Sequence, residues 1–479
     1  MNHNSWNIGI LTNHQKQQIR RPWKEAPSHV PFHRHFVAVL TCYMLLRTIT
    51  GAFSAGHQYH PVLLVVAGFV GPTTVITSHT QVLRRQRRPL IRRTMSKLSD
   101  TTPSFPPLID VDCNLWHDDL ASDVLLFPPS NNNNSTDTEE TSNVDDTDNA
   151  WEASIESLLQ RDAIQESNLV ALLSPSSTLI EARKGIAFLQ KRTSKELPII
   201  RTTVGVHPYH VHDDDLQAVD DPVAHVEQTI QELLYLDNHH VTVENDGPSD
   251  AVGDSEDTKS HVIAAIGECG LDTTDGFPPL SAQLPLFELQ VQLASQYKLP
   301  LFVHERGAFE ECQSILQEHA TNDIPILIHC FTGSVDDCRS YIDSGYFLSV
   351  SGYIFKTSPP SNDVEQPPPN SVVQCLQEGL IPLDRLMIET DAPYMGFSGC
   401  RELYVTKHSD YLQTLNAKKR KRLQNSIYPN VPSSLPLLLT EITHHINVGR
   451  QQRGEPILTQ EQVATYTTNN ANQFFQFNL

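Results

Sequence analysis

Eight short apolar, β-rich runs recur along the chain and restrict its fold more than any other feature. Most are separated by segments with helical periodicity, such as 286–298, where Phe287, Val291 and Ala294 share one face. The segment 334–345 has Ser334 and Gly345 at its two ends as candidate caps. Strands that alternate with helices indicate parallel β/α units, and eight units predict a (β/α)₈ TIM barrel. The runs are residues 106–112, 168–174, 198–207, 261–268, 299–306, 325–331, 346–352 and 384–391.

Most of these runs end in side chains that can bind a metal ion. In a parallel barrel the strand ends meet at one rim, where such enzymes place their chemistry. The mixture of carboxylates and imidazoles suits one or two divalent ions such as Mg²⁺, Mn²⁺ or Zn²⁺. A cation would also explain Glu268, because a buried carboxylate without a partner is costly. The rim candidates are Asp110, Asp112 and Asn114 at the end of the first run, His207 at the end of the third, Glu268, His304 and His329 at the ends of the next three, and Glu389 and Asp391 at the end of the eighth.

The charge distribution separates a leader from a body. Residues 1–94 contain twelve Lys and Arg and one acidic residue, a net charge of +11, whereas the remainder carries −32. Such an acidic body argues against a coat protein for nucleic acid, but metal ions could reverse the sign at a nuclease site. Two apolar stretches, 36–46 and 61–77, are shorter than the roughly 20 residues that span a bilayer. The leader is either a targeting segment or upstream of a start at Met95, and the two possibilities are equally supported.

The domain boundary is placed at residue 104. Residues 1–104 are expected to be disordered or targeting, and 105–479 to form the barrel. Three polar, acidic or proline-rich insertions interrupt the barrel, and their composition predicts flexible loops. They are residues 128–149, 237–260 and 356–371.

The remaining compositional signals concern surface and location. The basic segment 416–424 is either a phosphate-contacting or nuclear-import patch or, as such runs more often are, a solvated helix face. Eight scattered cysteines without a C-x-x-C pair indicate reduced thiols in an intracellular compartment. We therefore expect cytoplasm or nucleus, or an organelle through the leader. Cys269 and Cys330 adjoin two rim residues, and strand alternation predicts that they pack on the opposite face.

An ordered set of motifs resembles the TatD family of metal-dependent deoxyribonucleases from about Leu108 to Phe477. The set is "TVGVHPYH", "AAIGECGLD", "LPLFVHERGAFE", "ILIHCFTGSVDDCRSYIDSGYFLSVSGYIF", "LMIETDAPYM" and "TTNNANQFF". The resemblance implies an amidohydrolase-type barrel with divalent-metal phosphodiesterase activity. It also implies exonucleolytic trimming of DNA, at single strands or 3′ ends, with two metal ions. No stable protein partner can be inferred from the sequence.

The resemblance further implies roles for individual residues. Glu268 would bridge two metal ions, and His304 and His329 would bind one of them. Asp391 would be both a metal ligand and the base that acts on water. His207 would lie near the reactive phosphate. Arg306 and Lys356 would hold substrate phosphate, Arg306 through its fork of N–H donors.

Two departures from the family pattern matter. Many relatives begin with an H-x-H pair where this chain has Asp112 and Asn114 as expected metal ligands. The anionic Asp112 predicts a shift from Zn²⁺ towards Mg²⁺ or Mn²⁺. The segment 428–436 lacks an Arg and a Glu that relatives often carry, so a substrate contact could have moved to Arg401 or to 418–422.

Two other functions remain open at this point. The same metal rim could hydrolyse an amide or ester, because neither fold nor metal fixes the substrate. Arg306 and Lys356 favour phosphate. A non-catalytic scaffold is the second alternative, and the complete set of Glu268, His304, His329 and Asp391 speaks against it. Membrane association is considered for the leader alone.

Overall fold

The computed structural model describes residues 105–117, 119–120, 144–192, 197–239, 261–356 and 370–479. The chain divides into two units, residues 1–94 and 95–479. The sequence-based expectations for the leader, for the boundary at residue 104 and for most of the three insertions lie outside the described residues. Among the described helices, none combines the length and apolar character needed to cross a membrane.

All eight expected strands are present, and they pair in sequence order as one parallel sheet. An isolated parallel bridge joins Cys113 to Ala392, beyond the first and last strands, so the sheet curls into a nearly closed barrel. The (β/α)₈ TIM barrel predicted from the alternating pattern is therefore confirmed. The strands are β1 (Leu108–Asp110), β2 (Leu169–Ser174), β3 (Ile199–Val204), β4 (Ile263–Asp272), β5 (Leu301–Arg306), β6 (Ile326–Ile328), β7 (Phe347–Val350) and β8 (Leu386–Ile388).

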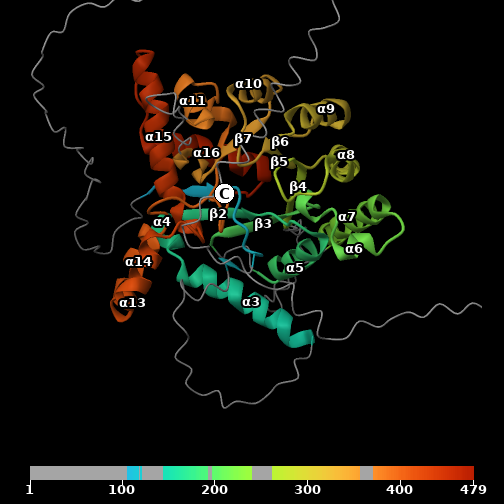
Figure 1. Cartoon of the computed structure of the whole chain (residues 1–479), viewed down its shortest axis with the longest axis horizontal. Helices are drawn as coiled ribbons and strands as arrows, with labels where there is room; N and C mark the ends of the chain where they lie inside the picture. The colour runs from blue at the N-terminus through green and yellow to red at the C-terminus, as the bar shows by residue number, and fades with distance from the viewer. Residues whose placement is uncertain (1–104, 118, 121–143, 193–196, 240–260, 357–369) are drawn as a thin grey trace, which may run out of the picture. The chain divides into compact units, whose positions relative to one another are not determined.

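Helices surround the strands in Figure 1. The capping box of α10 shows how the sequence sets a helix start, because Ser334 and Asp337 each accept a hydrogen bond from the other's backbone N–H. The main helices are α3 (Val144–Arg161), α5 (Leu179–Leu189), α7 (Pro222–His239), α8 (Leu280–Tyr297), α9 (Phe309–His319), α10 (Val335–Asp343), α11 (Ser371–Glu378), α12 (Glu402–Lys407), α13 (Ser409–Thr414), α14 (Ala417–Asn425), α15 (Leu435–Gln452) and α16 (Gln460–Phe475). Short helical segments are α4 (Ile164–Ser167), α6 (Asp214–Gln217), η1 (Pro208–His210), η2 (Gly352–Phe355), η3 (Leu383–Arg385) and η4 (Pro432–Ser434).

Some helix ends reach into the predicted insertions. α3 begins at Val144, α7 extends to His239, and α11 begins at Ser371. The polar composition of these stretches concealed the ends, because exposed turns of a helix need few apolar residues.

Two apolar clusters reflect the alternation of side chains along each strand. Leu108 and Leu172 belong to the larger cluster, while their neighbours Ile109 and Ala171 belong to a smaller one. Alternate residues face opposite sides of a strand, so the smaller cluster fills the barrel interior and the larger one packs beneath the helices. Aromatic residues at the end of α16, Phe474 and Phe475 among them, complete the smaller cluster.

Candidate active site at the barrel rim

The expected polar residues lie at one rim of the barrel, at the carboxyl ends of the strands. Glu268 and His304 lie within β4 and β5, and His329 follows β6 immediately. Asp112 follows β1, and Asp391 follows β8. Hydrogen bonds and close contacts join residues that are far apart in sequence, as the convergence of parallel strand ends requires.

Two glycines let β4 approach β5 closely around Glu268. Gly267 and Gly270 have φ of 140° and 148°, which L side chains rarely adopt. A Cβ atom at Gly270 would collide with the carbonyl oxygen of His304, and one at Gly267 with that of Phe302. The two glycines therefore permit the close approach that brings His304 to Glu268.

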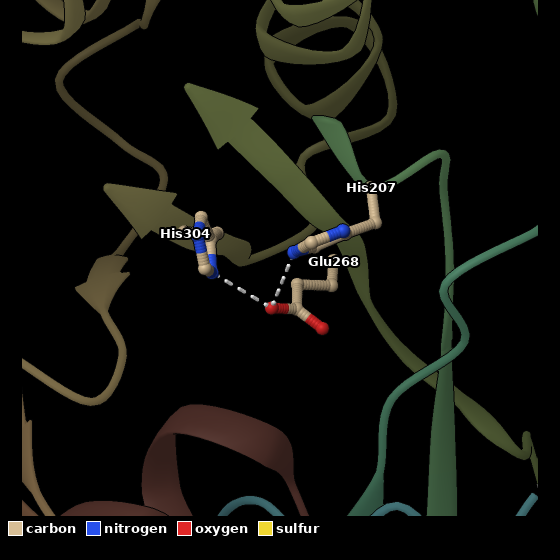
Figure 2. A group of neighbouring side chains, drawn as sticks. All are labelled: His207, Glu268 and His304. Atoms are coloured by element: carbon tan, nitrogen blue, oxygen red, sulfur yellow. Dashed lines mark hydrogen bonds and ion pairs between the residues drawn. The ribbon is translucent and has the colours of Figure 1, made fainter. Parts of the chain in front are cut away.

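The first group of side chains is rich in imidazole and contains His207, Glu268 and His304 (Figure 2). Glu268 Oε1 lies 3.4 Å from His207 Nε2 and 3.2 Å from His304 Nδ1. One candidate ligand atom from each residue lies within 4.8 Å of the others. His207 thus belongs with potential metal ligands, beyond the substrate-facing position that the sequence suggested.

The second group is rich in carboxylate and contains Asp112, His329 and Glu389, all buried. His329 Nδ1 lies 2.9 Å from Asp112 Oδ2 and 3.7 Å from Glu389 Oε1. Glu389 was noted at a strand end but was not assigned as a ligand. Ser349 donates a 2.6 Å hydrogen bond to its other oxygen, Oε2, which leaves Oε1 directed to the group.

Glu268 connects the two groups. Its Oε1 lies 2.8 Å from His329 Nε2, in addition to its contacts with the imidazoles of His207 and His304. A single carboxylate oxygen therefore faces three imidazole nitrogens. The ring of His329 also stacks on Phe302, with 4.7 Å between centroids, so packing from the barrel interior fixes its orientation.

Burial and mutual charge set the protonation of the cluster. Burial lowers the pKa of His207 to about 3, which keeps its imidazole neutral and able to bind a metal. Burial would raise the pKa of Glu268, but the imidazoles of His207 and His329 hold it well below its usual value. Burial raises the pKa of Asp112 well above normal, and Asp391 adds to this effect. Burial likewise raises the pKa of Asp391 to about 7.

Three atoms of the second group show why a cation fits. Asp112 Oδ2, His329 Nδ1 and Glu389 Oε1 are buried and have no hydrogen-bond partner among the described residues. Although Asp112 Oδ2 and His329 Nδ1 are 2.9 Å apart, their geometry is not that of a hydrogen bond. Buried polar atoms are normally satisfied, and a divalent ion would satisfy these three together. Carboxylate and imidazole donors at both groups suit divalent metals.

Asp391 lies beside the two groups and in neither of them. Its backbone has a φ of 51°, and its N–H donates to the Asp112 carbonyl at 2.8 Å. Asn114 Nδ2 is 3.3 Å from Asp391 Oδ1 and equally far from Asp112 Oδ1. Asn114 therefore donates to both carboxylates, and the metal-ligand role expected for its amide stays a prediction.

Asp272 is a supporting residue that the sequence reasoning missed. Its Oδ2 lies 2.8 Å from His304 Nε2, so it orients the imidazole whose Nδ1 faces Glu268. Such carboxylate–histidine pairs tune the basicity of metal-binding imidazoles. A signal was present, because Asp272 lies four positions after Glu268 in the same strand and shares its face.

The expected phosphate-binding residues, Arg306 and Lys356, interact with neighbours outside the two groups of candidate metal ligands. Arg306 Nη1 donates to the Glu305 carbonyl at 2.6 Å, and Lys356 Nζ lies 5.0 Å from the centroid of Tyr353. Among the described residues, neither forms an ion pair or hydrogen bond with the two groups. Arg401 is 2% exposed and donates to the Ser426 carbonyl at 2.6 Å, so its buried guanidinium anchors the chain.

The two cysteines beside rim residues are buried thiols. Cys269 and Cys330 are both fully buried, and burial raises the pKa of each thiol. Cys269 belongs to the larger apolar cluster, on the opposite strand face from Glu268. The packing role predicted from strand alternation is confirmed for Cys269.

A parallel barrel with clustered carboxylates and imidazoles at its rim defines a metal-dependent hydrolase. Residues 158–476, more than half of the chain, match the family model described as "TatD related DNase". The chain belongs to this family, as the sequence resemblance predicted.

Similar proteins carry related names. The chain is 29% identical over 206 residues to the "3'-5' ssDNA/RNA exonuclease TatD" of Rahnella sp. (strain Y9602), covering 43% of this chain and 62% of that protein. It is 34% identical over 134 residues to a Bacillus subtilis (strain 168) protein named as a metal-dependent hydrolase, covering 28% and 48%. The chain thus spans about half to three-fifths of the length of these relatives. A TatD family hydrolase structure from Entamoeba histolytica aligns at a TM-score of 0.48 and 18% identity, covering 78% and 99%.

Proposed function

We propose that this protein is a nuclease that removes nucleotides from the 3′ end of single-stranded DNA, with two divalent ions bound at the barrel rim. The observation that carries the proposal is Glu268 Oε1, which faces imidazole nitrogens of His207, His304 and His329 at 2.8–3.4 Å. A carboxylate in that position can join two adjacent metal sites. The names of the relatives support a nucleic acid substrate.

Each group would hold one ion. His207, Glu268 and His304 would hold the first, and Asp112, His329 and Glu389 the second. When bound, divalent ions supply a water nucleophile at neutral pH and neutralise charge on phosphoryl oxygens. The carboxylate-rich group offers hard oxygen donors, which favour Mg²⁺ and Mn²⁺ over Zn²⁺ at that site.

The chain's own residues would position the substrate and move the proton. Asn114 donates to Asp391 Oδ1, which leaves Oδ2 to accept the proton of the attacking water. Arg306 would bind a non-bridging phosphoryl oxygen through donors not used on the Glu305 carbonyl. Fixed donors of this kind stabilise developing negative charge without reorganisation during the reaction.

The test uses the full chain, stripped of metal, with single-stranded DNA that carries a label at its 5′ end. Restoring Mn²⁺ or Mg²⁺ should give a ladder of products that shortens one nucleotide at a time. An equivalent RNA strand measures the preference between the two nucleic acids. A folded, metal-loaded protein that releases no nucleotide but hydrolyses a model amide or ester would replace the nuclease with the amide or ester hydrolase alternative.

A further inference from the structure

Two exposed tyrosines lie beside the candidate active site. Tyr394 follows Asp391 by three residues, and its side chain and that of Tyr428 are 44% and 42% exposed. Their ring centroids are 6.3 Å apart. Burial, together with the negative charges of Asp391 and Glu268, raises the pKa of Tyr394 to about 12.

Hydrogen bonds from the segment after β1 fix both rings. The Asp119 backbone N–H donates to His117 Nδ1, so Nε2 of that imidazole carries the proton and donates to the Tyr394 hydroxyl at 2.9 Å. The Tyr428 hydroxyl donates to Asp119 Oδ2 at 2.6 Å. Both residues are partly exposed, and rings held in this way lose little side-chain entropy when a ligand stacks on them.

The tyrosines are joined to a strongly basic helix. α14 has the sequence AKKRKRLQN, without an acidic residue, and Lys418, Lys419, Lys421 and Arg422 are exposed. None of these four forms an ion pair with another described residue. This is a concentrated positive surface on a body that otherwise carries a large negative charge.

The junction between α14 and Tyr428 is rigidly built. Ser426, the C-cap of α14, donates through Oγ to the Tyr428 carbonyl at 2.6 Å and accepts from its N–H at 3.3 Å. The buried Arg401 guanidinium donates to the Ser426 carbonyl. The basic helix therefore ends three residues before Tyr428, whose ring lies next to that of Tyr394.

We propose that Tyr394, Tyr428 and the exposed cations of α14 bind the stretch of a single-stranded nucleic acid that lies beyond the cleaved phosphodiester. The tyrosine rings stack on bases, and the four cations contact backbone phosphates. Single-strand binding sites combine these two elements because every base has a stackable face and every linkage carries a charge. This inference rests on the proposed function, and it names the surface that gives that function its preference for single strands.

The test measures binding separately from cleavage, by fluorescence anisotropy of labelled oligothymidylates of two and twelve nucleotides with the metal-free full chain. Tyr394→Ala and Tyr428→Ala should each weaken binding of the twelve-nucleotide strand by about tenfold, the scale of one lost base stack. Tyr394→Phe keeps the ring and should retain most of the affinity. Tyr466→Ala, at an exposed tyrosine of α16, is the matched control and should bind as the unmodified chain does.

The contribution of the α14 cations to binding is measured separately, from the salt dependence of the affinity. Replacing Lys418, Lys419, Lys421 and Arg422 by Gln should flatten the dependence of log affinity on log salt by about 0.7 per lost phosphate contact. The loss of binding affinity should be larger for the twelve-nucleotide strand than for the dinucleotide. Unchanged twelve-nucleotide binding in folded variants, or an equal loss for both lengths, would overturn the proposal. Tight length-dependent binding without nucleotide release would instead overturn the nuclease and leave this surface intact.

Discussion

The two groups at the barrel rim differ in donor chemistry, although Glu268 of the first group also contacts His329 of the second. The first offers the imidazoles of His207 and His304 beside one carboxylate, and the second offers Asp112 and Glu389 beside one imidazole. The first is also the less enclosed, since His207 is only partly buried whereas all three members of the second are buried. The imidazole-rich group suits borderline metals at a position that substrate can reach, and the carboxylate-rich group suits hard ions at a closed position.

The largest expected effect comes from removing the carboxylate that both groups share. Glu268→Gln should lower nuclease activity by more than about 100-fold, because loss of even an outer-sphere partner of a metal ligand can cost that much. Metal titration by calorimetry should show that both groups lose affinity together. Glu318→Gln on the exposed side of α9 is the control. Loss of one metal with the other unchanged would contradict the shared role of Glu268.

The next effect separates metal binding from proton transfer. Asp391→Asn should keep the fold and both metal sites while lowering kcat by about 10² or more, as for other acid–base residues. The comparison uses circular dichroism, metal content and single-turnover cleavage. Asp336→Asn on the exposed surface of α10 provides the matched substitution. Near-full activity in Asp391→Asn would refute the role of Asp391 as the base.

A third prediction sharpens the difference between the groups. Asp112→His replaces a hard anionic oxygen with an imidazole beside His329, so metal preference should move towards Zn²⁺ over Mn²⁺ by at least about tenfold. Competition titrations monitored by elemental analysis measure this ratio. Stoichiometric, tight Zn²⁺ at both groups of the unmodified protein would contradict the assignment of the second group to hard ions.

The smallest effect concerns the imidazole-rich group alone. Asp272→Asn removes the carboxylate that faces His304 Nε2 at 2.8 Å, and metal affinity of that group should fall by about 10- to 100-fold. Asp275→Asn, at an exposed position three residues beyond the end of β4, should leave the affinity unchanged. Equal weakening at both groups would show that Asp272 supports the rim as a whole.

The barrel could be predicted from the sequence because each strand and helix is marked by a pattern within a short stretch of residues. Each strand appears as a short β-rich run, and the polar residue that ends it marks the rim. The grouping of those residues is not local, since it depends on how the barrel closes and on irregular register between β4 and β5 near Glu268. Asp112 and Glu389 therefore looked like independent strand ends, although they flank the same imidazole of His329.

Arg401 shows a different limit of sequence reasoning. A charged side chain in a loop suggests a substrate contact, but this guanidinium is buried and holds the carbonyls of Ser426 and Tyr428 at 2.6 and 3.5 Å. Nothing in the sequence reports which backbone carbonyls lack a donor. This anchor holds the end of α14 and the segment up to Tyr428 in place.

We propose that the rim holds two divalent ions, one in each group, with Glu268 next to both. Anomalous X-ray diffraction from crystals of the full chain soaked in Mn²⁺ tests this proposal directly. Two anomalous peaks are expected, one bounded by His207, Glu268 and His304 and the other by Asp112, His329 and Glu389. No anomalous peak at either group in a well-diffracting Mn²⁺-soaked crystal would contradict it.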